Sequence, residues 1–186
     1  MPRRGFGVLV AGCVLVSGVA MAQPRSDMED EDGTAKKNAW AEAEVALPPA
    51  PKPDDLLPFE PKAATGYRFF VDAQSIVISG DGVVHYTLVM RSASGAENIT
   101  YEGLRCETYE QKVYAYGRRD GKWSPASSAQ WQPVGTQDVF RQRRVLADDF
   151  FCRDNKMVKT RAEAIQRFKY PGPPTGGTTV RWRDAF

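Results

Sequence analysis

A glutamate and an arginine flank a glycine between Tyr101 and Cys106, and they are the first candidates for a polar binding site. The segment alternates like a β-strand, so Glu102 and Arg105 are expected on opposite faces. A glycine inside a strand permits close approach of a ligand, or it marks a bulge. Two interpretations follow: a polar site for a partner peptide or glycan, and a bulge at Gly103 beside which Arg105 binds groups of the protein itself.

Aromatic side chains indicate a second kind of binding. The chain contains four Trp and seven Tyr, and some of them could stack on the sugar rings of cell-wall glycans at one edge of the predicted sheet. In a domain this small, aromatic side chains more often fill the core. The residues predicted as possible partner-binding residues are Glu102, Arg105, Tyr116, Trp123 and Trp131.

Residue types that carry catalysis are scarce. The single histidine, His85, is expected to be an exposed or partly covered strand residue, and it would act as a base only if a serine and an acid converged on it. No GxSxG, P-loop or GxGxxG pattern occurs. The sequence therefore predicts no catalytic, metal-binding or cofactor-binding residues. A small cell-wall hydrolase stays as an alternative, and it would need two carboxylates across a cleft.

The N-terminus resembles an export signal. Arg3 and Arg4 precede an apolar run from Phe6 to Val19, and Ala20-Met21-Ala22 matches a cleavage site before Gln23. We predict that residues 1–22 are a signal peptide and that the mature protein is periplasmic. The run Val10-Ala11-Gly12-Cys13 also matches a lipobox, so an outer-membrane lipoprotein acylated at Cys13 is the alternative. Membrane association is expected only in that case.

The charge distribution argues against nucleic acid as a partner. Loss of Arg3 and Arg4 with the signal leaves equal numbers of basic and acidic residues. Residues 23–62 are acidic and residues 63–186 are mildly basic, but the basic charge is too small and scattered for nucleic-acid binding. Residues 23–39 are predicted to be an acidic disordered segment, because they lack apolar periodicity.

Two cysteines remain once Cys13 is removed with the signal, and they are Cys106 and Cys152. An even pair in an oxidising compartment predicts a disulfide. The competing interpretation, a reactive thiol, has no CxxC partner to support it.

A proline-rich segment precedes the predicted domain. Trp40 to Leu47 could form a short helix ended by Pro48-Pro49, and residues 47–62 should be extended and polyproline-like. Because Leu56, Leu57 and Phe59 are apolar, residues 40–62 are predicted to form a strap that docks on the domain. The alternative is a spacer whose apolar residues are reserved for a partner.

Residues 63–186 are predicted to be one α+β domain. From Gly66 to about Trp123 apolar residues alternate with polar ones between turn signals, which predicts an antiparallel meander of four or five strands. After Pro133 the spacing becomes helical from Val139 to Phe150. A second helix should begin at Thr160, with Glu163 completing a capping box. We expect two C-terminal helices, one of them packed on the sheet.

A resemblance to a known family runs from about residue 38 to 170. The chain resembles the cryptic neisserial protein-like family of exported bacterial proteins. The resemblance implies a small periplasmic or lipid-anchored protein. It implies no cofactor and no catalytic residue, because the family has none assigned. It is carried by Trp40, Glu44, Leu47-Pro48-Pro49, Leu56-Leu57-Pro58-Phe59, Phe69-Phe70-Val71-Asp72, residues 81–89, 101–106 and 114–117, and Phe150-Phe151-Cys152.

These observations favour an exported envelope protein that acts as a non-enzymatic binding or accessory module. Its partner would be another envelope protein or a cell-wall glycan. The alternatives are the small cell-wall hydrolase and a structural lipoprotein anchored through Cys13.

Overall fold

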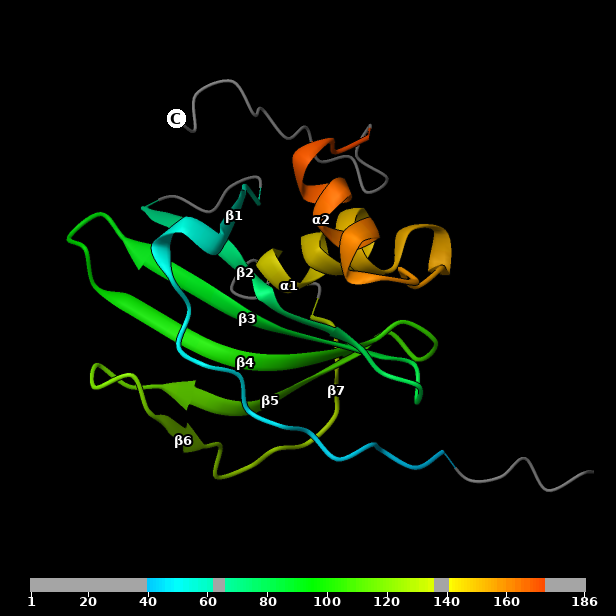
Figure 1. Cartoon of the computed structure of the whole chain (residues 1–186). Helices are drawn as coiled ribbons and strands as arrows, with labels where there is room; N and C mark the ends of the chain where they lie inside the picture. Colours follow the sequence, from blue (N-terminus) through cyan, green and yellow to red (C-terminus); the bar gives the residue numbers. More distant parts are fainter. Residues whose placement is uncertain (1–39, 62–65, 136–140, 173–186) are drawn as a thin grey trace, which may run out of the picture. The chain divides into compact units, whose positions relative to one another are not determined.

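The computed structural model describes residues 40–61, 66–135 and 141–172. The predicted signal peptide, lipobox and acidic segment lie outside these ranges, as do Val139, Phe140 and the residues after 172. Within the described ranges, a seven-stranded antiparallel sheet is followed by short helical segments (Figure 1).

Consecutive strands are neighbours in the sheet, in the order β1-β2-β3-β4-β5-β6, and β7 also pairs with β5. The predicted antiparallel meander is confirmed, but the predicted number of four or five strands was too low. The additional strands have two to four residues, which is too short for alternation to be visible in the sequence. The bounds are β1 Leu56–Phe59, β2 Tyr67–Ile78, β3 Val83–Ser92, β4 Glu97–Arg105, β5 Glu110–Gly117, β6 Trp123–Pro125 and β7 Gln132–Pro133.

Strand β3 shows why the sheet needs cover on both sides. Tyr86 and Leu88 point to one face, and Val83 and His85 point to the other, since side chains alternate along a strand. All four side chains are buried. The sheet therefore has two buried faces over its central strands.

The helices cover one of these faces (Figure 1). Helix α1, Arg141–Val145, continues into a π-helical turn at Leu146–Phe151, and a 3-10 turn at Arg153–Asn155 leads to α2, Arg161–Lys169. Thr160 Oγ1 accepts a hydrogen bond from the Glu163 backbone N–H, and Glu163 accepts one from the Lys159 backbone N–H. The two bonds fix the start of α2 at the predicted capping box.

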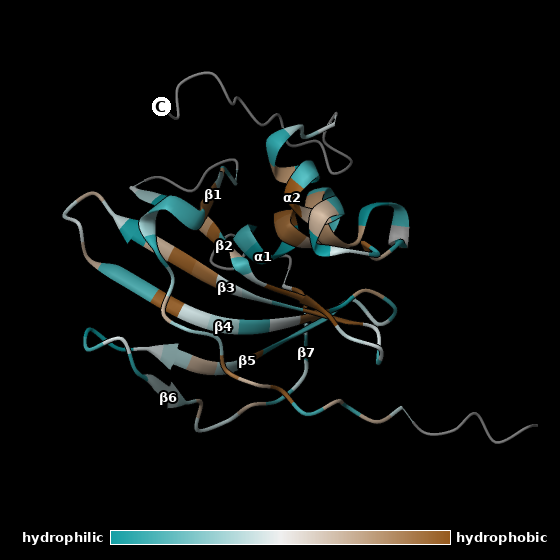
Figure 2. Ribbon diagram, viewed as in Figure 1, coloured by the Kyte–Doolittle hydropathy of each residue, from teal (hydrophilic) through white to brown (hydrophobic). Residues whose placement is uncertain are grey.

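Aromatic rings fill the space between the helices and the sheet. Phe150 and Phe168 stack with their ring centres 4.2 Å apart, and both contact Phe59 of β1. Tyr86 of β3 packs against Phe151 at 4.9 Å. Figure 2 shows the most apolar parts of the ribbon where the helices meet β2 and β3.

The predicted disulfide joins Cys106, directly after β4, to Cys152, directly after the π-helical turn. The two Cα atoms lie 5.3 Å apart, and both residues are buried. The bond ties the helical segment to the sheet across 46 positions of sequence. In the chain-entropy description, a loop of this length stabilises a fold by about 4 kcal/mol.

The strap is extended where it meets the sheet. Residues 40–52 contain neither helix nor strand, a 3-10 turn follows at Pro53–Asp55, and β1 then pairs with β2. The predicted short helix from Trp40 to Leu47 is therefore wrong. Trp40 binds the β2–β3 turn and Glu42, two residues later, binds β5, and side chains two residues apart share a face only in an extended chain.

We predict that Phe59→Ala lowers the free energy of unfolding by about 3 kcal/mol, because truncation of a buried phenylalanine leaves a cavity in the core. Leu47→Ala in the same strap is the control and should change it by less than about 0.5 kcal/mol, since Leu47 is 45% exposed. Urea denaturation measures both values. A shortened chain that begins at Lys62 should lose still more stability, and an unchanged melting temperature of that chain would show that the strap is only a spacer.

Candidate functional site

Glu102 lies in the interior, on the sheet face that the helices cover. Its side chain is 0% exposed, and Arg143 of α1 binds it through Nε and Nη2 at 2.8 and 2.6 Å. Tyr86 and Thr100 also donate hydrogen bonds to the carboxylate. Burial lowers the pKa of Arg143, but Glu102 outweighs burial and the pKa is raised. Glu102 therefore presents no surface to a partner in this structure.

Arg105 lies on the opposite face, as strand geometry predicted. Its guanidinium stacks over the ring of Trp40 at 4.1 Å, and it forms a 3.5 Å ion pair with Glu107. Gly103 between the two charged residues has a structural reason, because a Cβ there would lie 2.8 Å from the ring of Tyr114. The bulge is in the neighbouring strand β5, where the register shifts at Tyr114.

The sheet face beneath the strap is aromatic, and we call it the strap-side face. Its rings form a continuous chain in which Trp123, Tyr101, Tyr114, Trp131 and Trp40 follow one another with centres 5.7 to 6.5 Å apart. The structure thus brings three of the predicted residues, Arg105, Trp123 and Trp131, to one face. Tyr116 is not among them: it pairs with Thr100 on the helix side and is 47% exposed.

A carboxylate of the strap sits in the middle of this face. Lys112 Nζ, Tyr114 OH and Trp131 Nε1 donate hydrogen bonds to Glu42 at 2.7, 2.8 and 3.2 Å. We call these three donor residues the carboxylate socket. Burial raises the pKa of Glu42, but the bonds from Lys112, Tyr114 and Trp131 outweigh burial and hold the pKa below its usual value. Sequence reasoning missed the socket, because its members are 70 to 89 positions from Glu42.

His85 also lies on the strap-side face, and the prediction that it is exposed or partly covered was wrong. It is 3% exposed, between the rings of Tyr101 and Tyr114. Burial lowers the pKa of His85, and the nearby Asp81 opposes this only in part. The aromatic neighbours come from other strands, so the sequence around His85 carried no sign of its burial.

A serine and an acid do converge near His85, but in the wrong arrangement for a catalytic triad. Ser79 Oγ lies 3.1 Å from His85 Nε2 and 2.5 Å from Asp81 Oδ1. In a triad the acid binds the imidazole nitrogen remote from the serine. Here Asp81 binds Ser79 and the backbone N–H groups of Ala43 and Val83. The cluster holds the β2–β3 turn and the strap in place.

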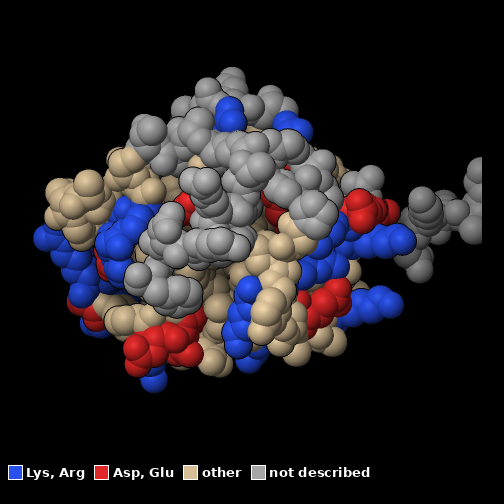
Figure 3. Space-filling model, turned by 90° about the horizontal axis from the view of Figure 1, so that it is seen from above, with Lys and Arg blue, Asp and Glu red and all other residues tan. Residues whose placement is uncertain are grey.

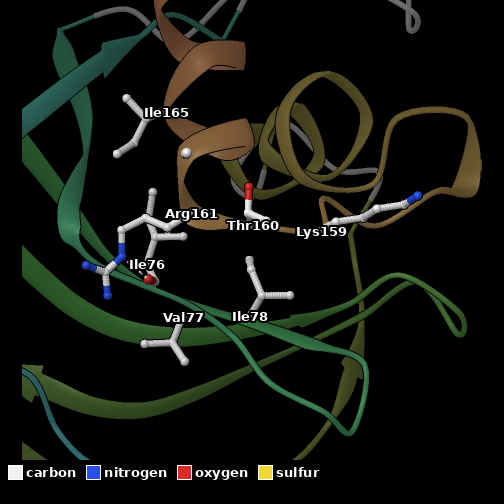
Figure 4. Close-up of a pocket in the computed structure, with 8 residues that line it drawn as sticks. Ile76, Val77, Ile78, Lys159, Thr160, Arg161 and Ile165 are labelled. Carbon is white, nitrogen blue, oxygen red and sulfur yellow. Dashed lines mark hydrogen bonds between the residues drawn. The ribbon is translucent and has the colours of Figure 1, made fainter.

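A separate groove of about 520 Å³ lies between the end of β2 and the start of α2. Figure 4 shows Arg161 reaching over β2, Ile165 pointing toward the strand, and Lys159 extending outward at the rim. No carboxylate lines this groove. The lining residues are Ile76, Val77, Ile78, Lys159, Thr160, Arg161, Ala162 and Ile165.

Three further features could indicate a function in the described part of the chain: a metal site, a membrane-spanning helix and a strongly charged surface. Residues 40–61, 66–135 and 141–172 contain no cluster of three His, Cys, Asp or Glu side chains placed to hold a metal ion. Neither described helix is long and apolar enough to span a membrane. In the view of Figure 3, basic and acidic side chains are interspersed.

Comparison with known proteins identifies the family of this disulfide-linked α+β protein. The model of the CNP1-like family matches residues 35–169, and the chain therefore belongs to the CNP1-like family. The resemblance noted in the sequence is confirmed.

A curated relative covers part of the same region. Cryptic neisserial protein 1 of Neisseria gonorrhoeae (strain ATCC 700825 / FA 1090) is 27% identical over an alignment of 114 residues, and the match covers 55% of this chain and 56% of the relative. The chain thus spans about half the length of the curated relative that it matches. No solved structure matches the chain.

We predict that His85 makes the fold less stable in mild acid. Its folded-state pKa is below the ordinary value of 6.5, so below pH 6.5 the unfolded chain binds a proton that the folded chain does not. The free energy of unfolding should fall as the pH drops from 6.5 toward the folded-state pKa, by at most about 1.4 kcal/mol per pH unit. Urea denaturation of wild type and His85→Gln between pH 7.5 and 5.5 isolates this contribution, and a variant with the same slope as wild type would contradict it.

Proposed function

We propose that this protein is an exported, non-enzymatic accessory protein of the bacterial envelope that binds an extended acidic segment of a partner protein. The observation that carries the proposal is the open edge of β2 beside the groove. Membership of the CNP1-like family and the export-like N-terminus support the envelope as its location.

The edge of β2 is open because β1 is shorter than β2. Strand β1 pairs with β2 only between Phe69 and Asp72, whereas β2 continues to Ile78. Among the described residues, no hydrogen bond to the backbone of Ile78 comes from this outer side. An open strand edge is a template on which an extended peptide can form main-chain hydrogen bonds.

Hydrogen-bond alternation shows which groups are available. Ser79 N–H donates to Val83 O at 3.0 Å, so Ser79 bonds toward β3. In an antiparallel ladder the preceding residue points its N–H and C=O away from that partner. Ile78 therefore directs both groups toward the outer edge. Ile76, two residues earlier, does the same with its C=O, which accepts a hydrogen bond from Arg161 Nε at 2.8 Å.

The side chains around this edge favour an acidic peptide. Ile78 and Ile165 supply an apolar surface, and Val77 is 43% exposed. Lys159 and Arg161 are exposed cations at the N-terminal end of α2, where the helix dipole adds further positive potential. A peptide with alternating apolar and acidic side chains would place the apolar ones on the isoleucines and the carboxylates beside the cations.

We predict that a labelled peptide of alternating valine and glutamate residues binds the protein, and that the double substitution Lys159→Glu and Arg161→Glu weakens binding by about tenfold through charge repulsion. Fluorescence anisotropy measures the affinities. Lys169→Glu, at the other end of α2, is the matched control and should bind as wild type does. Equal binding of a valine–lysine peptide, or no loss in the double variant, would contradict the proposal.

Export itself is tested by the intact mass of the protein recovered from bacterial envelopes. Cleavage after Ala22 predicts a mature chain that begins at Gln23. A chain that begins at an acylated Cys13 would instead establish the lipoprotein alternative, and a chain that retains Met1 to Ala22 would contradict cleavage.

A further inference from the structure

The carboxylate socket is built entirely by the sheet and the segment before β7. Lys112 and Tyr114 belong to β5, and Trp131 directly precedes β7. Lys112 Nζ also lies over the rings of Tyr114 and Trp131, at 5.1 and 5.8 Å from their centres. The ring of Tyr114 is held close to β4, because Gly103 has no side chain there. The three donors therefore belong to the domain, and the strap contributes the acid and the ring of Trp40, which packs against Trp131.

Between Trp40 and β1 the strap that supplies the acid is held by individual hydrogen bonds and ring contacts, and it forms neither helix nor strand before residue 53. Trp40 Nε1 donates to the backbone of Asp81, the Ala43 N–H donates to the Asp81 carboxylate, and Trp123 Nε1 donates to Pro48 O. Most side chains between residues 41 and 50 are exposed, so this part of the strap buries little beyond the residues that form these bonds. Segments with few buried apolar contacts open locally at low free-energy cost.

A second contact accompanies the carboxylate. Trp40, two residues before Glu42, lies edge-on to Trp131 at 5.7 Å and beneath the guanidinium of Arg105 at 4.1 Å. The surface thus holds an aromatic ring and a carboxylate two positions apart on one extended peptide. This pattern favours a peptide over a free anion, because a free anion would use only the socket.

We propose that the carboxylate socket is a binding site for an acidic peptide segment of a partner, with an aromatic residue two positions before the acid, and that Glu42 is an internal ligand that covers it. The site is on the strap-side face and is independent of the groove beside β2. A ligand tethered to its own site acts at an effective concentration in the millimolar range. A partner peptide therefore binds the wild-type chain weakly, and removal of the Glu42 carboxylate opens the site.

Chemical rescue tests whether the socket binds a carboxylate. In the full chain, Glu42→Ala should lower the melting temperature, and sodium acetate should restore it with saturating concentration dependence, since a ligand that binds only the folded state stabilises it. Sodium chloride at the same ionic strength should not. Glu44→Ala is the matched control, because Glu44 is exposed in the same strap, and it should not respond to acetate. A Glu42→Ala chain that responds to acetate no more than the control would overturn the proposal.

Binding in trans tests the peptide preference. A labelled peptide of residues 40–50 should bind the Glu42→Ala chain at least about fivefold more tightly than it binds wild type. The same peptide with Glu42→Gln should lose that advantage, and Lys112→Met in the Glu42→Ala chain should abolish it. If Glu42→Ala does not fold, Glu42→Gln provides the same comparison with the side-chain volume kept. Equal binding of the acidic and the amide peptide would refute recognition of the carboxylate.

Discussion

Both faces of the central strands must be covered, and this constraint determines most of the architecture. Val83 and Val84 are adjacent in β3 and point to opposite faces, yet both are completely buried. The helices cover one face, but the chain after β7 supplies no second layer in its described part. The strap N-terminal to the sheet takes that role. Because it is extended, it covers the second face without the backbone hydrogen bonds of a regular element.

The two faces bury charge in different ways. On the helix side, Glu102 and Arg143 form a two-bonded pair with further donors from the sheet. Loss of one partner from such a pair leaves a charge without compensation and is strongly destabilising. On the strap side, Glu42 and Lys112 are partly solvent-accessible, and water can replace either partner. The first pair is therefore part of the buried core, whereas the second lies where solvent reaches it, as the proposed exchange of Glu42 for a partner's carboxylate requires.

The sequence was informative where the cause of a structure is local. Alternation along β2 to β5, the capping box of Thr160 and Glu163, and the disulfide could all be predicted from neighbouring residues or from the redox compartment. The short strands β1, β6 and β7 could not, since a strand of two to four residues has no measurable period. Proline in β1 also concealed a strand that an edge position tolerates.

The candidate sites were harder to predict, because their partners are distant in sequence. Arg143 is 41 positions from Glu102, and Trp131 is 89 positions from Glu42. No local pattern marks such pairs. Residue type alone placed Arg105, Trp123 and Trp131 among the candidates, but it could not separate them from Tyr116, which the β5 bulge leaves on the other face.

The positions of the indole rings determine which part of the protein its intrinsic tryptophan fluorescence monitors. The three described tryptophans, Trp40, Trp123 and Trp131, all lie on the strap-side face. Intrinsic fluorescence of these residues therefore senses the cover over that face and is nearly blind to the helical layer. Far-ultraviolet circular dichroism, in contrast, senses the backbone of the sheet and the helices. In a Trp182→Phe variant, which removes the tryptophan that lies outside the described residues, a difference between the two signals during denaturation would separate release of the strap from unfolding of the domain.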